Sequence, residues 1–403
     1  MMRFENFREA FFAVARRSKK LGIETVNIEE ALGRVCSKTV RALLPNPPFS
    51  NSRWDGFAVR AADVERATVD HPVELRIKKE HVITAGRTDR LIVEPGWCCP
   101  IMSGAPLPEG TDAVVKLEDV ELKGDTIRVK TPVSSGDGLW KSGSFWKAGE
   151  VLVDKGTRIR PYNVFKLAEA GFRSVEVFRK PKIAIFAVGD ELTPPGIPLK
   201  EASRYGGVQY FIRALAVTFG MFVGWEGILP DSVETIKKAL CEAREGGADL
   251  VITTGGTGKG VKDLIVKTWI ECGGEVLFQN ISLVPGKSTA GGVTGDTPWI
   301  ALPGGVMGAV VSFVEACKII ALEWYGSGDA IIPSCKTVLG EEVDRIEGMY
   351  RATWGCVENR NGTLIFLPNS TNDANLRKIN GYILIEPGSG SVPKGTTCET
   401  VVF

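Results

Sequence analysis

The apolar positions of this chain change their period along its length, and each change predicts a different kind of structure. From residue 4 to 19 they recur at helical spacing, and Asn27 followed three positions later by Glu30 has the pattern of a capped helix start. From about 64 to 135 short β-rich runs alternate with turn residues. That pattern predicts a small β domain with strands at 73–77, 91–93, 113–117 and 126–129.

Beyond residue 181 the pattern becomes a regular alternation of strands and helices. One stretch of helical spacing ends at Gly220, and another begins at Asp231 with Glu234. The strand-like runs between them are 183–188, 249–254, 275–278 and 299–302. Such alternation predicts a mostly parallel sheet with helices on both faces. After residue 326 short strands return at 352–356, 363–367 and 381–386, which predicts a C-terminal β domain.

The length and net charge of the chain limit the classes of protein to which it can belong. A chain of 403 residues is expected to form two to four domains. It contains 49 Lys and Arg against 48 Asp and Glu, so no basic excess is available to neutralise a nucleic acid. No apolar run reaches about 18 residues, so we expect no segment that spans a membrane.

The cysteine and histidine content limits the kinds of catalytic or metal site that the chain can form. Nine cysteines are scattered along the chain, and the adjacent pair Cys98 and Cys99 lacks C-x-x-C spacing. With no signal-peptide pattern at the N-terminus, this predicts reduced thiols and a cytoplasmic location. The two histidines, His71 and His81, are too few for a His-rich zinc site and disfavour a Ser-His-Asp triad. Carboxylates, lysines and backbone groups are therefore left to carry any chemistry.

The first candidate site is the glycine-rich segment that follows the strand-like run 249–254. Its residues are Gly255, Gly256, Thr257, Gly258, Lys259 and Gly260, and a helical pattern begins near Asp263. Such backbone can turn its N–H groups toward an anion, and ligands of open α/β sheets bind beyond the carboxyl ends of the strands. The residues alone leave two interpretations equally open, a phosphate or oxyanion cradle and a glycine-rich connection that binds nothing.

Acidic residues at two other places are also candidates for a site. Asp55, followed by Gly56, is either part of a tight turn or a carboxylate held in a fixed place, and the pair favours the turn. Glu118 and Asp119 follow a predicted strand and are expected to be a solvated strand end.

Together these segments resemble the MoeA family of molybdopterin molybdenumtransferases over nearly the whole chain. The stretch I-M-S-G-A-P-L-P-E-G-T-D-A-V-V-K-L-E-D-V at 101–120 is the most specific. The other matching segments, in the family's order, are V-N-I-E-E-A-L-G-R-V, L-P-N-P-P-F-S-N-S-R-W-D-G-F-A-V-R, V-G-D-E-L, P-G-K and A-L-P-G-G-V.

The resemblance implies a multi-domain fold of α/β plus β type. An N-terminal unit over 1–179 would be extended and helical at 1–48 and 138–179, with an inserted β domain at about 49–137. A MogA-like three-layer α/β domain that binds molybdopterin would follow over 180–326, and a C-terminal β-barrel over 327–403. It also implies a homodimer whose active cleft lies between the α/β domain of one subunit and the inserted domain of the other.

The reaction implied is insertion of molybdate or tungstate into adenylylated molybdopterin, with release of AMP and participation of Mg²⁺. A molybdopterin adenylyltransferase would be the upstream partner. Metal transfer to a dithiolene needs an oxyanion site, a phosphate cradle and carboxylates rather than a nucleophilic side chain. The chain offers these groups.

Residue by residue, the resemblance assigns catalytic roles to Asp55, Asp190 and Asp263, and makes Asp190 and Asp263 the candidate metal ligands. It assigns substrate binding to Ser103, Glu191, Gly255, Gly256, Thr257, Gly258, Lys259, Gly260, Lys287, Pro303 and Gly304.

Several site positions depart from the family pattern. The glycine loop reads G-G-T-G-K-G, as in the related adenylyltransferases, where the family usually has G-G-V-S-x-G. The family's acidic pair in R-x-x-G-E-D is replaced by Ser144 and Phe145, and its Tyr-Asp-x-Asn segment reads Y-G-G-V at 205–208. The basic residue before P-G-K is Val284, and P-G-N-P has become P-G-G-V. Lost carboxylates weaken a cation site more than a backbone-lined phosphate site.

Three functions are therefore compatible with the sequence. The first is a working molybdenum or tungsten insertase, favoured because Asp55, Asp190, Asp263 and Lys287 are all present. The second is a diverged paralogue that binds molybdopterin or nucleotide as a carrier or regulator. The third is a molybdopterin adenylyltransferase, suggested by the T-T-G-G-T-G loop.

Overall fold

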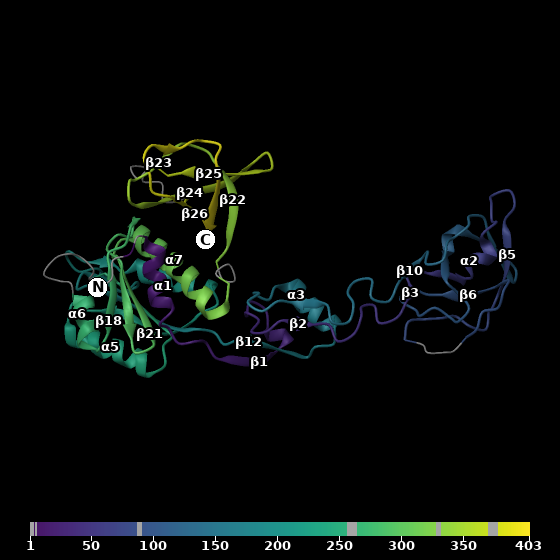
Figure 1. Ribbon diagram of the computed structural model, residues 1–403, viewed down its shortest axis with the longest axis horizontal. Coiled ribbons are helices and arrows are strands. Elements are labelled where there is room, and N and C mark those ends of the chain that lie inside the picture. Colours follow the sequence, from purple (N-terminus) through teal and green to yellow (C-terminus); the bar gives the residue numbers. More distant parts are fainter. Residues whose placement is uncertain (1–3, 5, 87–90, 256–263, 328–331, 370–377) are drawn as a thin grey trace. The chain divides into compact units, whose positions relative to one another are not determined.

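The chain forms two compact units in the computed structural model, which describes residues 4, 6–86, 91–255, 264–327, 332–369 and 378–403 (Figure 1). The first unit comprises Met1–Lys38, Lys155–Arg160 and Ser174–Phe403. The second comprises Thr39–Asp154 and Pro161–Arg173.

A six-stranded sheet forms the centre of the first unit. In spatial order its strands are β16 (Phe222–Leu229), β13 (Lys182–Val188), β17 (Leu250–Thr254), β21 (Thr297–Leu302), β20 (Ala290–Thr294) and β18 (Glu275–Gln279). The first four run parallel, and β20 and β18 pair antiparallel at one edge. The predicted mostly parallel sheet is confirmed. The sequence pattern missed β16 and β20, because glycines interrupt both strands.

Helices cover both faces of this sheet. Ile183 and Ile185 of β13 share a buried core with helices α1 (Phe7–Ala15), α4 (Gly207–Thr218) and α7 (Val306–Tyr325). Ala184 and Phe186 of the same strand share a second core with α5 (Val233–Glu245) and α6 (Leu264–Glu271). Successive residues of a strand point to opposite faces, and a sheet buried on both faces needs a continuous apolar strand such as β13. The three-layer α/β prediction is confirmed.

The N-terminal helix is shorter than the expected 4–19. Helix α1 spans Phe7–Ala15 and begins where the side chain of Asn6 accepts a 3.0 Å hydrogen bond from the backbone N–H of Glu9. The helix expected after Asn27 is wrong. Only a 3₁₀ turn, Ile28–Glu30, forms there, and Asn27 makes no side-chain capping bond.

The C-terminal strands close into a five-stranded barrel (Figure 1), which confirms the predicted β-barrel. Its strands are β24 (Tyr350–Arg360), β25 (Thr363–Pro368), β22 (Ser334–Leu339), β28 (Thr397–Val402) and β26 (Gly381–Ile385), and β26 pairs back onto β24. Tyr382 of β26 is buried against α7, where its hydroxyl donates a 2.6 Å hydrogen bond to Glu315. The barrel is thus anchored to the α/β domain by a buried polar contact.

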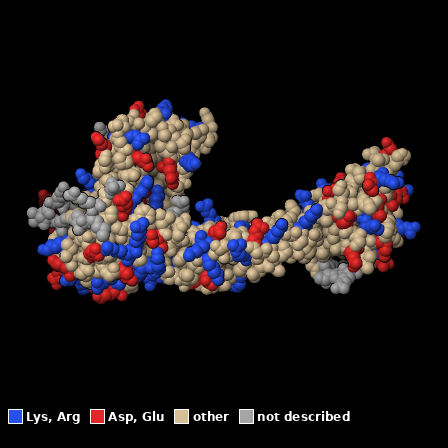
Figure 2. All heavy atoms as spheres, viewed as in Figure 1, with Lys and Arg blue, Asp and Glu red and all other residues tan. Residues whose placement is uncertain are grey.

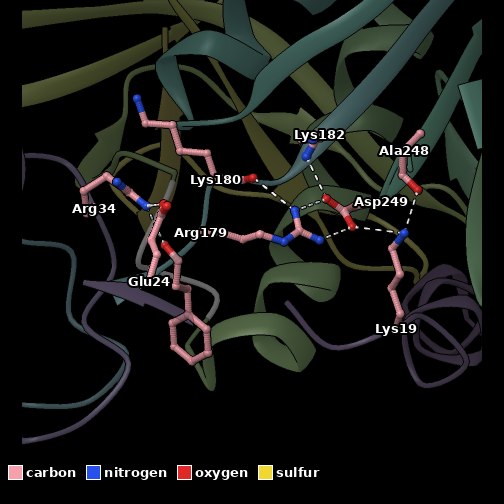
Figure 3. Close-up of polar contacts among 9 residues, drawn as sticks. Lys19, Glu24, Arg34, Arg179, Lys180, Lys182, Ala248 and Asp249 are labelled. Carbon is pink, nitrogen blue, oxygen red and sulfur yellow. Dashed lines mark hydrogen bonds and ion pairs between the residues drawn. The ribbon is translucent and has the colours of Figure 1, made fainter. Parts of the chain in front are cut away.

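A buried ion cluster fixes the start of β17 (Figure 3). Asp249 accepts two hydrogen bonds from the Arg179 guanidinium, at 2.5 and 2.6 Å, and one of 2.8 Å from the Lys182 N–H. The Lys19 ammonium lies 3.3 Å from the same carboxylate. The cluster ties the segment after α1 to the end of the sheet where β17 begins.

The second unit contains a six-stranded mixed sheet. Its strands, in spatial order, are β7 (Ala113–Lys116), β4 (Gly56–Val59), β6 (Trp97–Ile101), β5 (Val73–Ile77), β9 (Thr126–Val129) and β8 (Val120–Lys123). Three of the four expected strands are confirmed. The fourth is wrong, since residues 91–93 contribute only an isolated bridge between Ile92 and Glu109.

The Asp55-Gly56 pair does not form the expected turn. Gly56 opens strand β4 and pairs with Ile101 on one side and Lys116 on the other. A Cβ at Gly56 would lie 2.0 Å from the carbonyl oxygen of Val115. Glycine is therefore present because the neighbouring strand passes too close for a side chain, and Asp55 sits at the strand's beginning.

Acidic and basic side chains both occur across the visible surface (Figure 2). No helix within the described ranges is long and apolar enough to cross a membrane.

Candidate functional site

A cavity of about 500 Å³ opens beyond the carboxyl ends of β13 and β17 in the first unit. Its walls include the turn after β13, the first turn of α4 and the residue that follows β17. Its lining includes Gly189, Glu191, Arg204, Tyr205, Gly206, Gly207, Gln209, Asp231, Thr254, Gly255, Ser288 and Gly304. This is the edge at which open α/β sheets bind ligands, and the volume lies in the range of small-molecule sites.

Gly255 lines this cavity in a backbone conformation that favours glycine. Its φ of +87° belongs to the left-handed region, and a Cβ there would lie 2.5 Å from the carbonyl oxygen of Val188. Gly304, after β21, lies beside it, since a Cβ on Gly304 would contact the Gly255 Cα at 3.6 Å. Of the other predicted binding residues here, Pro303 is half-buried next to Gly304, and Lys287 is exposed next to the lining residue Ser288.

Most of the glycine-rich segment lies outside the described residues. This applies to Gly256, Thr257, Gly258, Lys259, Gly260 and Asp263. Their assignment to a phosphate cradle and a cation site stays a prediction.

Asp190 and Glu191 lie at the turn after β13, and Asp231 follows the neighbouring strand β16. The Asp190 carboxylate accepts a 3.0 Å hydrogen bond from the backbone N–H of Asp231. Glu191 is ion-paired with Arg204 at 3.1 Å. The described residues contain no group of three His, Cys, Asp or Glu side chains placed to hold a metal ion. Among these residues, any cation would depend on one or two carboxylates plus other oxygen ligands.

The first turn of α4 contributes polar groups of a different kind. The first N–H groups of a helix have no partner within the helix and carry partial positive charge. In the same turn, Gln209 is only 4% exposed, and its carbonyl oxygen Oε1 has no hydrogen-bond partner among the described residues. Sequence reasoning missed Gln209. The only signal was its position directly after the unusual Y-G-G-V segment.

A second candidate position lies in the second unit. The backbone N–H of Ser103 donates a 2.7 Å hydrogen bond to the Asp55 carboxylate, so the structure brings these two predicted residues together. The Arg53 guanidinium next to them lies 4.4 Å from the centre of the Trp140 ring. Glu118 and Asp119 form an exposed 3₁₀ turn, as expected for a solvated strand end.

The fold and the cavity define a multi-domain protein with a ligand-binding α/β domain. Residues 5–171 match the model of the MoeA N-terminal region (domain I and II), and residues 184–321 match that of a probable molybdopterin binding domain. The chain belongs to the MoeA family of molybdopterin molybdenumtransferases, enzymes of molybdenum cofactor biosynthesis.

Individual relatives match over most of their length. The molybdopterin molybdenumtransferase of Haemophilus influenzae is 31% identical over 304 residues, covering 75% of this chain and 73% of the relative. That of Bacillus subtilis is 29% identical over 403 residues, covering 98% and 93%. The crystal structure of the molybdopterin biosynthesis MoeA protein from Pyrococcus horikoshii superposes with a TM-score of 0.81 at 26% identity, covering 99% of each chain.

Proposed function

We propose that this protein inserts molybdate or tungstate into the dithiolene of adenylylated molybdopterin and releases AMP. Membership of the family supports this activity, as do relatives that are named molybdopterin molybdenumtransferase. The observation that carries the proposal is the cavity at the carboxyl ends of β13 and β17, inside the segment that matches a molybdopterin binding domain.

The chemistry of the cavity suits this substrate. Backbone N–H groups at the first turn of α4 can orient polar substrate atoms, and the carboxylates of Glu191 and Asp231, two residues that line the cavity, can accept its N–H groups. The phosphates would lie against the glycine-rich segment that continues from Gly255. Metal transfer requires positioning and charge stabilisation, which such a site provides without a nucleophile.

A Mg²⁺ ion is part of the proposal. Asp190 fits as a ligand because carboxylate oxygens are the donors that Mg²⁺ prefers, and Asp263 would be the second. Mg²⁺ usually takes one or two carboxylates and completes its octahedron with water and substrate phosphate oxygens, so a cluster of three acidic side chains is not required. The ion would neutralise phosphate charge.

The active protein would be a homodimer, supplied with substrate by a molybdopterin adenylyltransferase. In this arrangement the Asp55–Ser103 pair of one subunit would complete the cavity of the other. No role for nucleic acid or a membrane is included in the proposal.

A single-turnover assay tests the function. Purified protein is mixed with adenylylated molybdopterin, Mg²⁺ and either molybdate or tungstate, and AMP release is followed. We expect release that depends on the oxyanion, and the faster of the two oxyanions identifies the metal. Consumption of ATP with free molybdopterin would instead indicate an adenylyltransferase. Binding without either reaction would indicate a carrier, and either result would overturn the proposal.

A further inference from the structure

Two cysteine thiols meet at the surface of the α/β domain. Cys241 lies within α5, and Cys272 directly follows α6, 31 positions later in the chain. Their Sγ atoms are 3.8 Å apart, and both side chains are partly exposed. The two thiols are therefore in contact with each other and can be reached by a small molecule in solution.

The helices hold the backbone of both cysteines in place. Helices α5 and α6 share one buried core on the same face of the sheet (Figure 1). The backbone N–H of Cys272 donates a 2.9 Å hydrogen bond to the carbonyl oxygen of Thr268, so Cys272 is fixed to the end of α6. A disulfide has an S–S bond of about 2.05 Å, so the two Sγ atoms must come about 1.7 Å closer. Rotation of the side chains about their Cα–Cβ bonds supplies such a movement while both helices stay in place.

Two cations lie close to the pair. Lys237 and Arg244 stand about one helical turn before and after Cys241 on α5. Burial raises the pKa of the Cys272 thiol to about 11, and the Cys241 thiol acts in the same direction, whereas the charges of Lys237 and Arg244 lower it. Thiol–disulfide exchange proceeds through the thiolate, which neighbouring cations stabilise. The surroundings therefore favour the reactive form of a partly buried thiol.

We propose that Cys241 and Cys272 are a redox modification site, at which a small disulfide such as oxidised glutathione converts the two thiols into an intramolecular disulfide. The thiolate of one cysteine attacks a sulfur of the small disulfide, and one small thiolate leaves. The second cysteine, as a thiolate, attacks the protein sulfur of this mixed disulfide and expels the other small thiolate. The protein loses two protons and two electrons, and the small disulfide takes them up as two thiols.

The new bond joins the helices that precede and follow β17 in the chain. Thr254 and Gly255, at the carboxyl end of this strand, line the candidate cavity, whereas Cys241 and Cys272 do not. A cross-link between these positions reduces the entropy of the unfolded chain and should raise the unfolding temperature of the first unit by about 5 °C. The modification thus stabilises the domain that carries the cavity, whatever the cavity binds.

Oxidised glutathione tests the site on the wild-type protein. The reduced full-length protein is incubated with it, the remaining thiols are blocked with N-ethylmaleimide, and peptides are mapped by mass spectrometry without reductant. We expect two peptides joined through Cys241 and Cys272, which separate after treatment with dithiothreitol. Free thiols at both positions, glutathione that stays attached to one of them, or a bond to a different cysteine would overturn the proposal.

Substitutions test the stabilising effect. Cys241→Ser and Cys272→Ser should each lose the joined peptides and the rise in unfolding temperature. Cys335→Ser is the matched control, since Cys335 is also partly exposed but lies in strand β22 of the barrel, and it should keep both. Peptide mapping of the wild-type protein decides the site even where a variant does not fold. Joined peptides without any rise in unfolding temperature would overturn the stabilising role.

Discussion

Among the described residues, the carboxylate of Asp190 accepts one hydrogen bond, from the backbone N–H of Asp231. Asp190 stands between Gly189 and Glu191, which both line the cavity, and the bond orients its side chain there. Its charge is thus available to a cation or a substrate group. The neighbouring Glu191 differs, because its charge is balanced by Arg204.

Replacement of Asp190 by Asn should lower the single-turnover rate of AMP release by about 10²–10³-fold, because a preorganised charge at the reacting groups is lost. Asp263→Ala should have at least this effect. Both variants should keep the wild-type unfolding temperature. Asp296→Asn is the matched control, since Asp296 is an exposed residue of the same unit in the turn before β21. A rate equal to that of the control would remove Asp190 from the site.

The carboxylate of Asp249 stabilises the fold and is not part of the candidate site. Burial raises its pKa, but the hydrogen bonds from Arg179 and the Lys182 N–H, together with the charges of Arg179 and Lys19, outweigh burial, so its pKa is below the ordinary value. The cluster lies at the end of β17 opposite the cavity, so it stabilises the fold without contacting substrate.

Asp249→Ala should lower the free energy of unfolding by about 3–5 kcal/mol at pH 7, because it leaves Arg179 and Lys19 without their partner. Since the folded-state pKa lies below the unfolded value of about 3.9, the wild-type contribution is complete above that pH and is lost as the pH falls through the folded-state pKa. Urea unfolding at pH 7 and below pH 4 measures this. A gap between variant and wild type that does not narrow in acid would contradict the linkage.

At the scale of elements, the sequence predicted those strands whose apolar runs are bounded by turn residues. Strands β5 and β9 are confirmed over the predicted 73–77 and 126–129. Strands β4 and β6 were missed because Gly56 and Pro100 suggest turns, and only the packing of neighbouring strands explains why Gly56 is required. The pattern of apolar and polar residues along the chain indicates which residues are buried, but it does not show how closely two backbones approach.

The sequence also does not show which residues of the candidate site are in contact. The Asp55–Ser103 hydrogen bond joins residues 48 positions apart through the pairing of β4 with β6, and strand register is not visible in a single sequence. The resemblance to the MoeA family indicated that both residues belong to the site, but it did not show that they are in contact. Gln209 could not be predicted, because its burial, and the absence of a partner for its Oε1 among the described residues, arise only when α4 packs on the sheet.

Gly56→Ala tests the close strand contact. The new Cβ would meet the Val115 carbonyl at 2.0 Å, so β4 and β7 must separate, at a cost of roughly 2–4 kcal/mol to the inserted sheet. Thermal unfolding and limited proteolysis of the second unit measure the effect. Gly227→Ala is the control, because Gly227 also lies in a strand but a Cβ there meets nothing within 4 Å. Equal stability of the two variants would show that the strands adjust without cost.

At the scale of the whole molecule, the candidate residues lie in two units. The cavity is in the first unit, and the Asp55–Ser103 pair is in the second. The proposed dimer would let one subunit complete the site of the other.

Sedimentation equilibrium at micromolar concentration should give a mass twice the 43.6 kDa of one chain. The proposed cleft requires residues from two subunits, so dilution to the monomer should abolish AMP release in parallel. A mixture of Asp55→Asn and Asp190→Asn chains should recover part of the activity, because one of the two clefts of a mixed dimer then contains no altered residue. A single-chain mass at all concentrations would contradict the dimer.

The assembly of the first unit from three separate segments has a consequence for protein synthesis. Phe7 and Phe11 of α1 are fully buried, and their core includes residues of α7. The ribosome must therefore translate everything from Arg16 to Gly305 before α1 can find this partner, which takes on the order of tens of seconds at roughly 5–20 residues per second. The second unit is complete long before then and can fold first. During that interval Phe7 and Phe11 lack the α7 residues that cover them in the folded structure, so the aromatic face of α1 stays exposed.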